Sequence, residues 1–227
     1  MATIVLNFKN YPQSIGRKAV TLAKIAEKVA KDTGVEIIVA PNIVDLRAVA
    51  SEVSIPVYAQ HIDPHKLGAA TGYVMPEAVK EAGAVGTLLN HSERRLLLED
   101  LTEALQRARS VGLKVIICAG SPMSSGAAAR LGPDAVAFED PVLIGTGISV
   151  STAKPEDVRR SVDAILTANP NVAPLCGAGV TTGDDVYAAL KLGSKGVLLA
   201  SGFVKATDPE AVLREMANAV LRYEQEK

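Results

Sequence analysis

Short apolar runs rich in valine, isoleucine and leucine alternate along this chain with longer segments of helical periodicity, eight times in 227 residues. The runs predict strands at residues 4–8, 35–40, 56–60, 84–89, 113–118, 134–138, 171–176 and 195–199. Helical or partly helical sequence follows each strand, which implies right-handed crossovers and a parallel sheet. Eight such units in this length favour a closed (β/α)8 barrel over an open doubly wound sheet.

The chain has no Pro/Gly/Ser-rich linker and no shift in composition, so we predict a single domain over residues 1–227. Its 24 Lys+Arg against 25 Asp+Glu, with few aromatic residues, argue against nucleic acid as a partner. No apolar run is long enough for a signal peptide or a membrane span, so we expect no membrane partner and a cytoplasmic location. Cys118 and Cys176 lie on strands that are not neighbours in such a barrel, which argues against a disulfide.

In a barrel of this kind, the functional groups lie at the carboxyl ends of the strands. Asn7 and Lys9 end the first strand two residues apart, on the face opposite Ile4, Leu6 and Phe8. If the apolar face packs on helices, Asn7 and Lys9 point to the barrel axis. A lone lysine at a strand end is more often a solvated charge, but the asparagine on the same face favours a site.

Glu139 directly follows the strand at 134–138 and shares a face with Ala135 and Ala137. A carboxylate on the small-residue face of a buried strand is costly unless something uses it. Residues 140–147 then bring a proline, an apolar middle and two glycines, a composition that suits a lid moving between two fixed ends. The alternative is an ordinary surface loop beside a solvated glutamate.

His91 follows the fourth strand, in the run Asn90-His91-Ser92-Glu93-Arg94-Arg95. We predict that the chain turns into a helix here, with Ser92 and Glu93 in the right place for N-terminal capping, and that the helix spans about Leu97 to Val111. A helix N-terminus disfavours positive charge, so His91 would stay neutral and donate a hydrogen bond. The alternatives are a structural histidine and a solvated charge run after it.

Two loops have the composition of anion cradles: Cys176-Gly177-Ala178-Gly179 after the seventh strand and Ala200-Ser201-Gly202 after the eighth. These loops are the usual phosphate site of such barrels, with backbone amides as donors, and Gly145 could add a third amide. A net charge of −1 means that any bound anion is held by local amides rather than by a broad basic field. Alternatively, the glycines serve turns alone.

The segment His61-Ile62-Asp63-Pro64-His65 would place three metal-ligand side chains on one side if it were extended. Its proline and short loop favour a surface interaction instead, so we predict no metal.

Four segments together resemble the triosephosphate isomerase family in their order and barrel position. They are Asn7-Phe8-Lys9, the run from Asn90 to Arg95, Glu139 with Ile144-Gly145-Thr146-Gly147, and Gly177-Ala178-Gly179. The resemblance covers essentially the whole chain and is to the compact archaeal form. It implies a TIM barrel that interconverts D-glyceraldehyde 3-phosphate and dihydroxyacetone phosphate through an enediolate, in glycolysis and gluconeogenesis. It implies no cofactor and no metal.

The resemblance also implies roles for individual residues. Glu139 would be the base. A neutral His91 would polarise the carbonyl and shuttle protons between the oxygens of the enediolate. Lys9 would supply positive charge and Asn7 would orient the oxygens, with Glu93 beside Lys9. The implied substrate- and phosphate-binding residues are Asn7, Lys9, Ile144, Gly145, Gly177, Gly179, Ala200 and Ser201.

The chain departs from the family pattern after Glu139, where Asp140 intervenes before Pro141. This change could loosen the first hinge of the lid, and a second carboxylate could raise the pKa of the base. Ala200-Ser201 stand where the family commonly has a glycine pair, and residues 148–150 do not match its common second hinge.

Two other functions stay open: a phosphosugar epimerase, whose known form uses metal-bound acid and base residues, and a non-catalytic phosphate-binding barrel. Family members are dimers or, in the short archaeal form, often tetramers, so a homo-oligomer is expected, with the tetramer favoured. The small-residue apolar segment at residues 68–74 is the candidate subunit contact, or else a plain loop.

Overall fold

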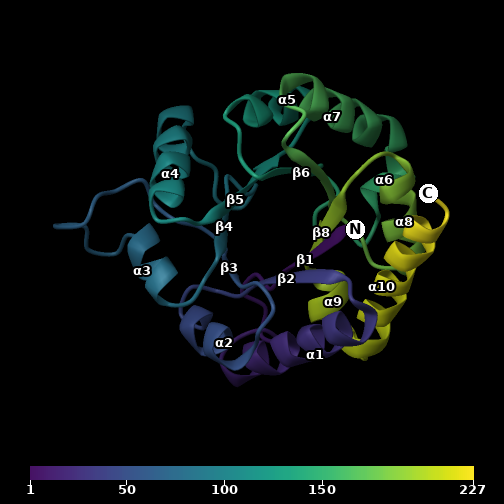
Figure 1. The fold of residues 1–227 in the computed structure, drawn as a ribbon, viewed down its shortest axis with the longest axis horizontal. Coiled ribbons are helices and arrows are strands. Elements are labelled where there is room, and N and C mark those ends of the chain that lie inside the picture. The colour runs from purple at the N-terminus through teal and green to yellow at the C-terminus, as the bar shows by residue number, and fades with distance from the viewer.

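Eight parallel strands curl into one barrel with helices on its outside, in a computed structural model that describes residues Met1–Lys227 (Figure 1). The strand order around the sheet is β2-β1-β8-β7-β6-β5-β4-β3. The last junction, between β2 and β3, is a single parallel bridge from Val39 to Val57. The predicted single-domain (β/α)8 barrel is thus confirmed. The strands are β1 Thr3–Asn7, β2 Glu36–Ala40, β3 Tyr58–Ala59, β4 Gly86–Leu89, β5 Lys114–Ala119, β6 Ala135–Glu139, β7 Ala173–Gly177 and β8 Gly196–Leu199.

The outer layer contains eight helices of six residues or more and two shorter ones. Helix α1 ends where Gly34 adopts a left-handed φ of 72° and donates its N–H to the carbonyl of Ala30. The longer helices are α1 Arg17–Thr33, α2 Leu46–Glu52, α3 Pro76–Glu81, α4 Leu98–Ser110, α5 Pro122–Arg130, α7 Pro155–Ala168, α8 Gly183–Lys191 and α10 Pro209–Gln225. The short helices α6 Val150–Ala153 and α9 Ser201–Val204 were not expected from the sequence. None of the helices is long and apolar enough to cross a membrane.

Alternation along each strand divides the core into two layers. Ile4, Leu6 and Phe8 pack in the layer between strands and helices, whereas Val5 fills the barrel interior. Asn7 shares the interior face with Val5, because residues two apart on a strand point the same way.

The same alternation on β6 places Ala135 and Ala137 in the barrel interior and Val136 and Phe138 in the layer beside the helices. Glu139 is therefore the last residue of β6 that points into the barrel. Both cysteines are free and buried; Cys118 belongs to the interior layer and Cys176 to the outer one.

Strand register brings the polar ends of the strands to one level. Asn7 pairs with Ala40 across β1 and β2, and Glu139 pairs with Gly177 across β6 and β7. Since all strands are parallel, these residues meet at the same mouth of the barrel, where the sites of such folds are built.

Candidate active site

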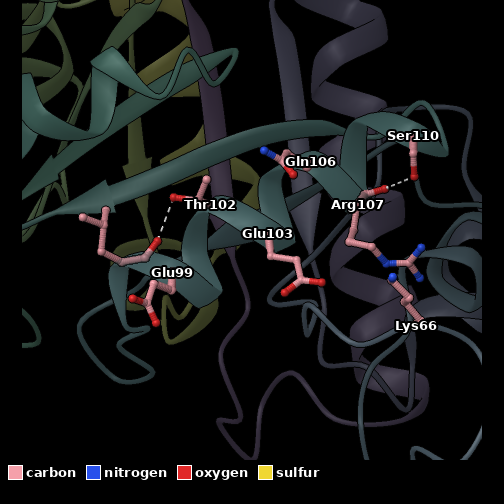
Figure 2. A pocket seen from close by; sticks show the side chains of 8 residues that line it. Lys66, Glu99, Thr102, Glu103, Gln106, Arg107 and Ser110 are labelled. Carbon is pink, nitrogen blue, oxygen red and sulfur yellow. Dashed lines mark hydrogen bonds between the residues drawn. The ribbon is translucent and has the colours of Figure 1, made fainter.

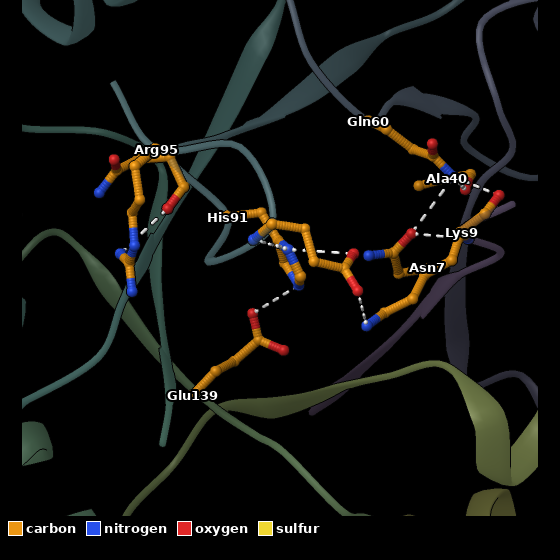
Figure 3. Close-up of polar contacts among 9 residues, drawn as sticks. Asn7, Lys9, Ala40, Gln60, His91, Arg95 and Glu139 are labelled. Carbon is orange, nitrogen blue, oxygen red and sulfur yellow. Dashed lines mark hydrogen bonds and ion pairs between the residues drawn. The ribbon is translucent and has the colours of Figure 1, made fainter. Parts of the chain in front are cut away.

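Four polar side chains, from the segments after β1 and β4 and from the end of β6, form a chain of contacts at the mouth (Figure 3). The Lys9 Nζ lies 2.8 Å from Glu93 Oε1, and Glu93 Oε2 lies 3.5 Å from His91 Nδ1. On the other side of the imidazole, His91 Nε2 lies 3.4 Å from Glu139 Oε2. The predicted groups are therefore neighbours in space, although 130 positions separate Lys9 from Glu139 in the chain.

The prediction that Ser92 and Glu93 cap a helix is wrong, whereas the helix predicted near Leu97 to Val111 is confirmed as α4. Residues 92–97 form turns and an extended stretch, and α4 begins only at Leu98. The imidazole is oriented by another contact, because the Glu93 backbone N–H donates to His91 Nδ1 at 3.2 Å. A ring that accepts at Nδ1 is neutral and carries its proton on Nε2, the nitrogen that faces Glu139. Its approach to the Glu93 carboxylate is therefore not an ion pair.

Glu139 and His91 each expose only 6% of their surface, yet each has one buried polar atom without a hydrogen-bond partner. The two atoms are Glu139 Oε2 and His91 Nε2, which face one another across 3.4 Å. Buried polar atoms are normally paired, because leaving them unpaired costs free energy. An acceptor and a donor held in this way are suited to a ligand that engages both.

Glu139 also influences the thiol beside it. Burial, and then the charge of Glu139, raise the pKa of Cys118 well above its usual range. Cys118 is therefore a neutral packing residue rather than a nucleophile.

Lys9 is held in an uncommon backbone conformation. Its φ of 48° is left-handed, and its N–H donates to Asn7 Oδ1 at 3.0 Å. Gln60 Nε2 lies within 3.3 Å of Asn7 Oδ1, 3.1 Å of the Lys9 carbonyl and 3.0 Å of the Ala40 carbonyl (Figure 3). Strain of this kind is maintained only where the surroundings fix it, and it concentrates at functional sites.

Sequence reasoning missed Gln60 as a site residue. The available signal was its position, because it directly follows β3 at the same end of the barrel as the other polar residues.

The loops expected to bind phosphate lie against one another and against the end of the lid. Val150 N–H donates to the carbonyl of Ala178 at 3.1 Å, which joins the chain after the lid to the loop after β7. A Cβ on Gly202 of α9 would lie 2.6 Å from the carbonyl of Val180, so the loops after β7 and β8 also touch. Ala200 and Ser201 open α9 beside them.

The two lid residues expected to bind the phosphate differ in their exposure. Gly145 is exposed, whereas Ile144 is partly buried against the main core. Gly179 has a φ of 70°, and a Cβ there would overlap the carbonyl of Ile148, so only glycine lets the end of the lid approach this loop.

Gly177→Ala is expected to lower kcat by at least roughly tenfold, because small displacements at a reacting group are costly. The added Cβ would lie 2.7 Å from Glu139 Cγ and 2.8 Å from the carbonyl of Leu198, so Glu139 must move. Steady-state kinetics and thermal unfolding would measure the effect. Gly126→Ala in α5 is the control, since its nearest neighbour would be 3.3 Å away. Unchanged kcat in Gly177→Ala would contradict the requirement for this close packing.

The three potential metal ligands at residues 61–65 do not converge. Asp63 accepts hydrogen bonds from His61 Nε2, Arg94 and the Val74 N–H, and burial is the main cause that lowers the pKa of His61. The ring of His65 instead packs edge-on against Tyr73, with centroids 3.7 Å apart. No group of three His, Cys, Asp or Glu side chains has the arrangement of a metal site.

Two hollows on the surface differ in the residues that line them. One of about 470 Å³ opens at the barrel mouth and is lined by Asn7, Lys9, His91 and Glu93 among others. A larger one, of about 800 Å³, lies on the outer face of α4 between Glu99 and Ser110 (Figure 2). Its lining is almost entirely polar and includes none of the strand-end residues, so the chemistry of the lining, rather than the size of the hollow, identifies the candidate active site.

Comparison with known proteins gives a consistent result. A family model described as triosephosphate isomerase matches residues 2–220. Over 217 residues the chain is 52% identical to a triosephosphate isomerase of Methanosarcina barkeri, covering 96% of this chain and 98% of that protein. It is 52% identical over 218 residues to that of Pyrobaculum calidifontis, covering 96% of each. It is 50% identical over 213 residues to that of Methanocaldococcus jannaschii, covering 94% and 97%.

Proposed function

The chain belongs to the triosephosphate isomerase family, and we propose that Glu139, His91 and Lys9 carry out its interconversion of D-glyceraldehyde 3-phosphate and dihydroxyacetone phosphate. The observation that carries these roles is the pair of buried, unpartnered atoms Glu139 Oε2 and His91 Nε2, 3.4 Å apart. An assay coupled to a dehydrogenase that consumes one of the two triose phosphates tests the activity directly.

Isomerisation begins when the Glu139 carboxylate removes a proton from the carbon next to the substrate carbonyl. Two electrons from the broken C–H bond then form a carbon–carbon double bond, and negative charge develops on the carbonyl oxygen. Glu139, now protonated, gives the proton to the former carbonyl carbon. His91 moves a proton from the hydroxyl oxygen on the first carbon to the former carbonyl oxygen, so the first carbon becomes the new carbonyl and the exchange of aldose and ketose is complete. A carboxylate that is 6% exposed is suited to this step, because no water competes for the proton.

His91 donates its Nε2 proton toward the oxygen on which charge develops. The Glu93 N–H on Nδ1 fixes the tautomer that makes this donation possible. Lys9 places a cation on the far side of the same oxygens, and Asn7 and Gln60 hold its backbone in place. Donors that are already oriented before the reaction stabilise developing charge without a reorganisation cost.

The phosphate of the substrate would be held by backbone amides of Gly145, Gly177, Gly179, Ala200 and Ser201, with Ile144 closing over it. The contact between the loops after β7 and β8 supports this role, as does the packing of Ile148 on Gly179. The lid would then close over the enediolate and exclude water, a behaviour for which triosephosphate isomerases are a standard example.

A metal-dependent epimerase is the alternative with a distinct chemical signature. The site offers one carboxylate base opposite a neutral imidazole, and His61, Asp63 and His65 do not converge on one point. Isomerase activity that survives prolonged chelation would separate the two functions, and so would the absence of epimerised pentose phosphate.

We also propose that the chain acts in the cytoplasm as a homo-oligomer, and that a tetramer is favoured over a dimer. The loop around residues 64–74 projects from the barrel beside α3 and α4 (Figure 1), with Leu67 67% and Tyr73 49% exposed. A hollow of about 510 Å³ beside the mouth is lined by Ile43 and Val44, which also leave apolar surface open to solvent. Such surface favours a partner of the same chain.

Leu67→Asp is expected to reduce the assembled mass, because a carboxylate would replace an exposed apolar contact on the projecting loop. Sedimentation velocity at several concentrations measures the mass.

A tetramer with two kinds of interface needs a second face, and Leu97, Leu98 and Met123 at the starts of α4 and α5 are exposed. Met123→Asp is therefore expected to yield dimers. Unchanged mass in both variants would contradict the proposed contacts.

A further inference from the structure

Asp140 is a buried carboxylate, 7% exposed, that the reaction does not use. It follows the base directly in the chain, which led to the expectation that it would raise the pKa of Glu139. In the structure the Asp140 side chain contacts Val142 and Lys154. Its Oδ1 accepts from the Val142 N–H at 2.9 Å, and its Oδ2 accepts from Lys154 Nζ at 2.5 Å. These contacts hold the pKa of Asp140 below its usual value, so it is a paired anion.

Lys154 lies beyond the far end of the lid, directly after the short helix α6. It joins α6 to α7, where its N–H donates to the Val150 carbonyl and its own carbonyl accepts from Asp157 N–H at 3.1 Å. The ion pair with Asp140 therefore joins the first residue after β6 to the junction that follows the lid, 14 positions away.

The first hinge of the lid also packs against a neighbouring loop. A Cβ on Gly120 would lie 3.0 Å from Pro141 Cγ, so the proline ring packs closely on the loop after β5. With Leu143 N–H donating to the Asp140 carbonyl at 3.0 Å, residues 140–143 form a compact turn. The ion pair is the link that connects this turn to the junction between α6 and α7.

We propose that Asp140 and Lys154 form an ionic brace that ties the first residue of the lid to the junction between α6 and α7 and thereby positions Glu139. Because the brace concerns the base, it rests on the proposed function. Both members are positioning residues, since neither touches the reacting atoms. The brace is asymmetric, because the Asp140 carboxylate is buried whereas 41% of the Lys154 side-chain surface is exposed.

This asymmetry predicts that the two single variants lose activity to different extents. Lys154→Met leaves a buried carboxylate with no cation one residue from the base, so the turn must open to hydrate it. Asp140→Asn leaves only an exposed lysine without its partner, and water solvates that lysine. The side-chain oxygen of the new asparagine still accepts from the Val142 N–H. We expect kcat to fall by roughly tenfold in Lys154→Met, as for other small displacements of a reacting group, and by less in Asp140→Asn. Adding Asp140→Asn to Lys154→Met should restore most of the loss, and Lys154→Arg should keep wild-type activity.

Two measurements separate a brace from a general structural role. Hydrogen exchange without substrate reports directly on the Val142 and Leu143 amides, which both donate to Asp140. We expect these amides to exchange faster in Lys154→Met than in wild type. The enediolate should also eliminate more inorganic phosphate per isomerisation turnover, because a loosened lid holds the intermediate less firmly. In this side reaction electrons from an enediolate oxygen re-form a carbonyl, the double bond shifts toward the carbon that bears the phosphate, and the C–O bond to the phosphate breaks.

The matched control is Arg160→Met, which removes one charge from α7, the helix that follows Lys154, and breaks only an exposed pair with Asp157. It should leave exchange, phosphate release and kcat as in wild type. Unchanged exchange and kcat in Lys154→Met would overturn the brace, as would a double variant no more active than Lys154→Met. Hydrogen exchange needs no catalysis, so these outcomes stay distinct from a failure of Glu139 as base, which the variant at residue 139 tests.

Discussion

Replacing Glu139 with glutamine is expected to lower kcat by roughly 10²–10⁴-fold or more while the barrel stays folded. Glutamine has nearly the same shape as glutamate but cannot take up the substrate proton. The side chain lies at the end of β6 and contributes little to the core, so the strand register should survive. Steady-state kinetics in both directions measure the loss, and circular dichroism with thermal unfolding measures the fold.

Glu103→Gln provides the matched control, because Glu103 is a carboxylate on the outer face of α4, where it lines a hollow that includes no residue of the barrel mouth (Figure 2). That variant should keep wild-type activity. If Glu139→Gln retained kcat within tenfold of wild type, Glu139 could not be the base, and the role of the unpartnered pair at the mouth would need another explanation.

His91→Gln should lower kcat by roughly 10²–10³-fold, the loss typical when one oriented donor to a developing oxyanion is removed. Glutamine carries an N–H donor, yet it has no ring nitrogen to accept the Glu93 N–H that orients the imidazole. Since the donated bond strengthens as charge develops, KM should change much less than kcat. Full kinetics in both directions measure this difference.

His61→Gln serves as the comparison for His91, because His61 lines the same hollow but is tied to Asp63 rather than to Glu139. Its kcat should fall by less than tenfold. Binding of a phosphate-bearing enediolate mimic adds a second readout, and it should weaken in His91→Gln while binding of inorganic phosphate stays the same. Equal kcat losses in the two histidine variants would contradict a special role for His91.

Much of the molecule could be predicted from sequence because the relevant signals are local. A period of two along a strand assigns each residue to the barrel interior or to the helix layer, and this pattern correctly separated Ala137 from Phe138. The same pattern on β1 separated Asn7 from Leu6. Parallel strands then bring their carboxyl ends to one mouth, so the candidate residues were recognisable before any distance was known.

Helix boundaries and side-chain partners were less predictable. The run after His91 contains good capping residues, but Asn90 adopts a left-handed φ of 59° and bonds to the Cys118 carbonyl, and the chain remains in turns until Leu98. Contacts with a distant strand overrode the local preference there. The charge of Asp140 was likewise visible, but its effect depended on a lysine 14 residues further along.

By itself, the sequence determined the barrel, the inward faces of its strands and the set of polar residues at their ends, because each follows from the spacing of neighbouring residues. Only the tertiary structure decided the tautomer of His91, the amide contacts of Gln60, the lack of room for a side chain at Gly177 and the pairing of Asp140 with Lys154. Each of these depends on groups that meet through space from separate elements, and no local pattern encodes the distance between them.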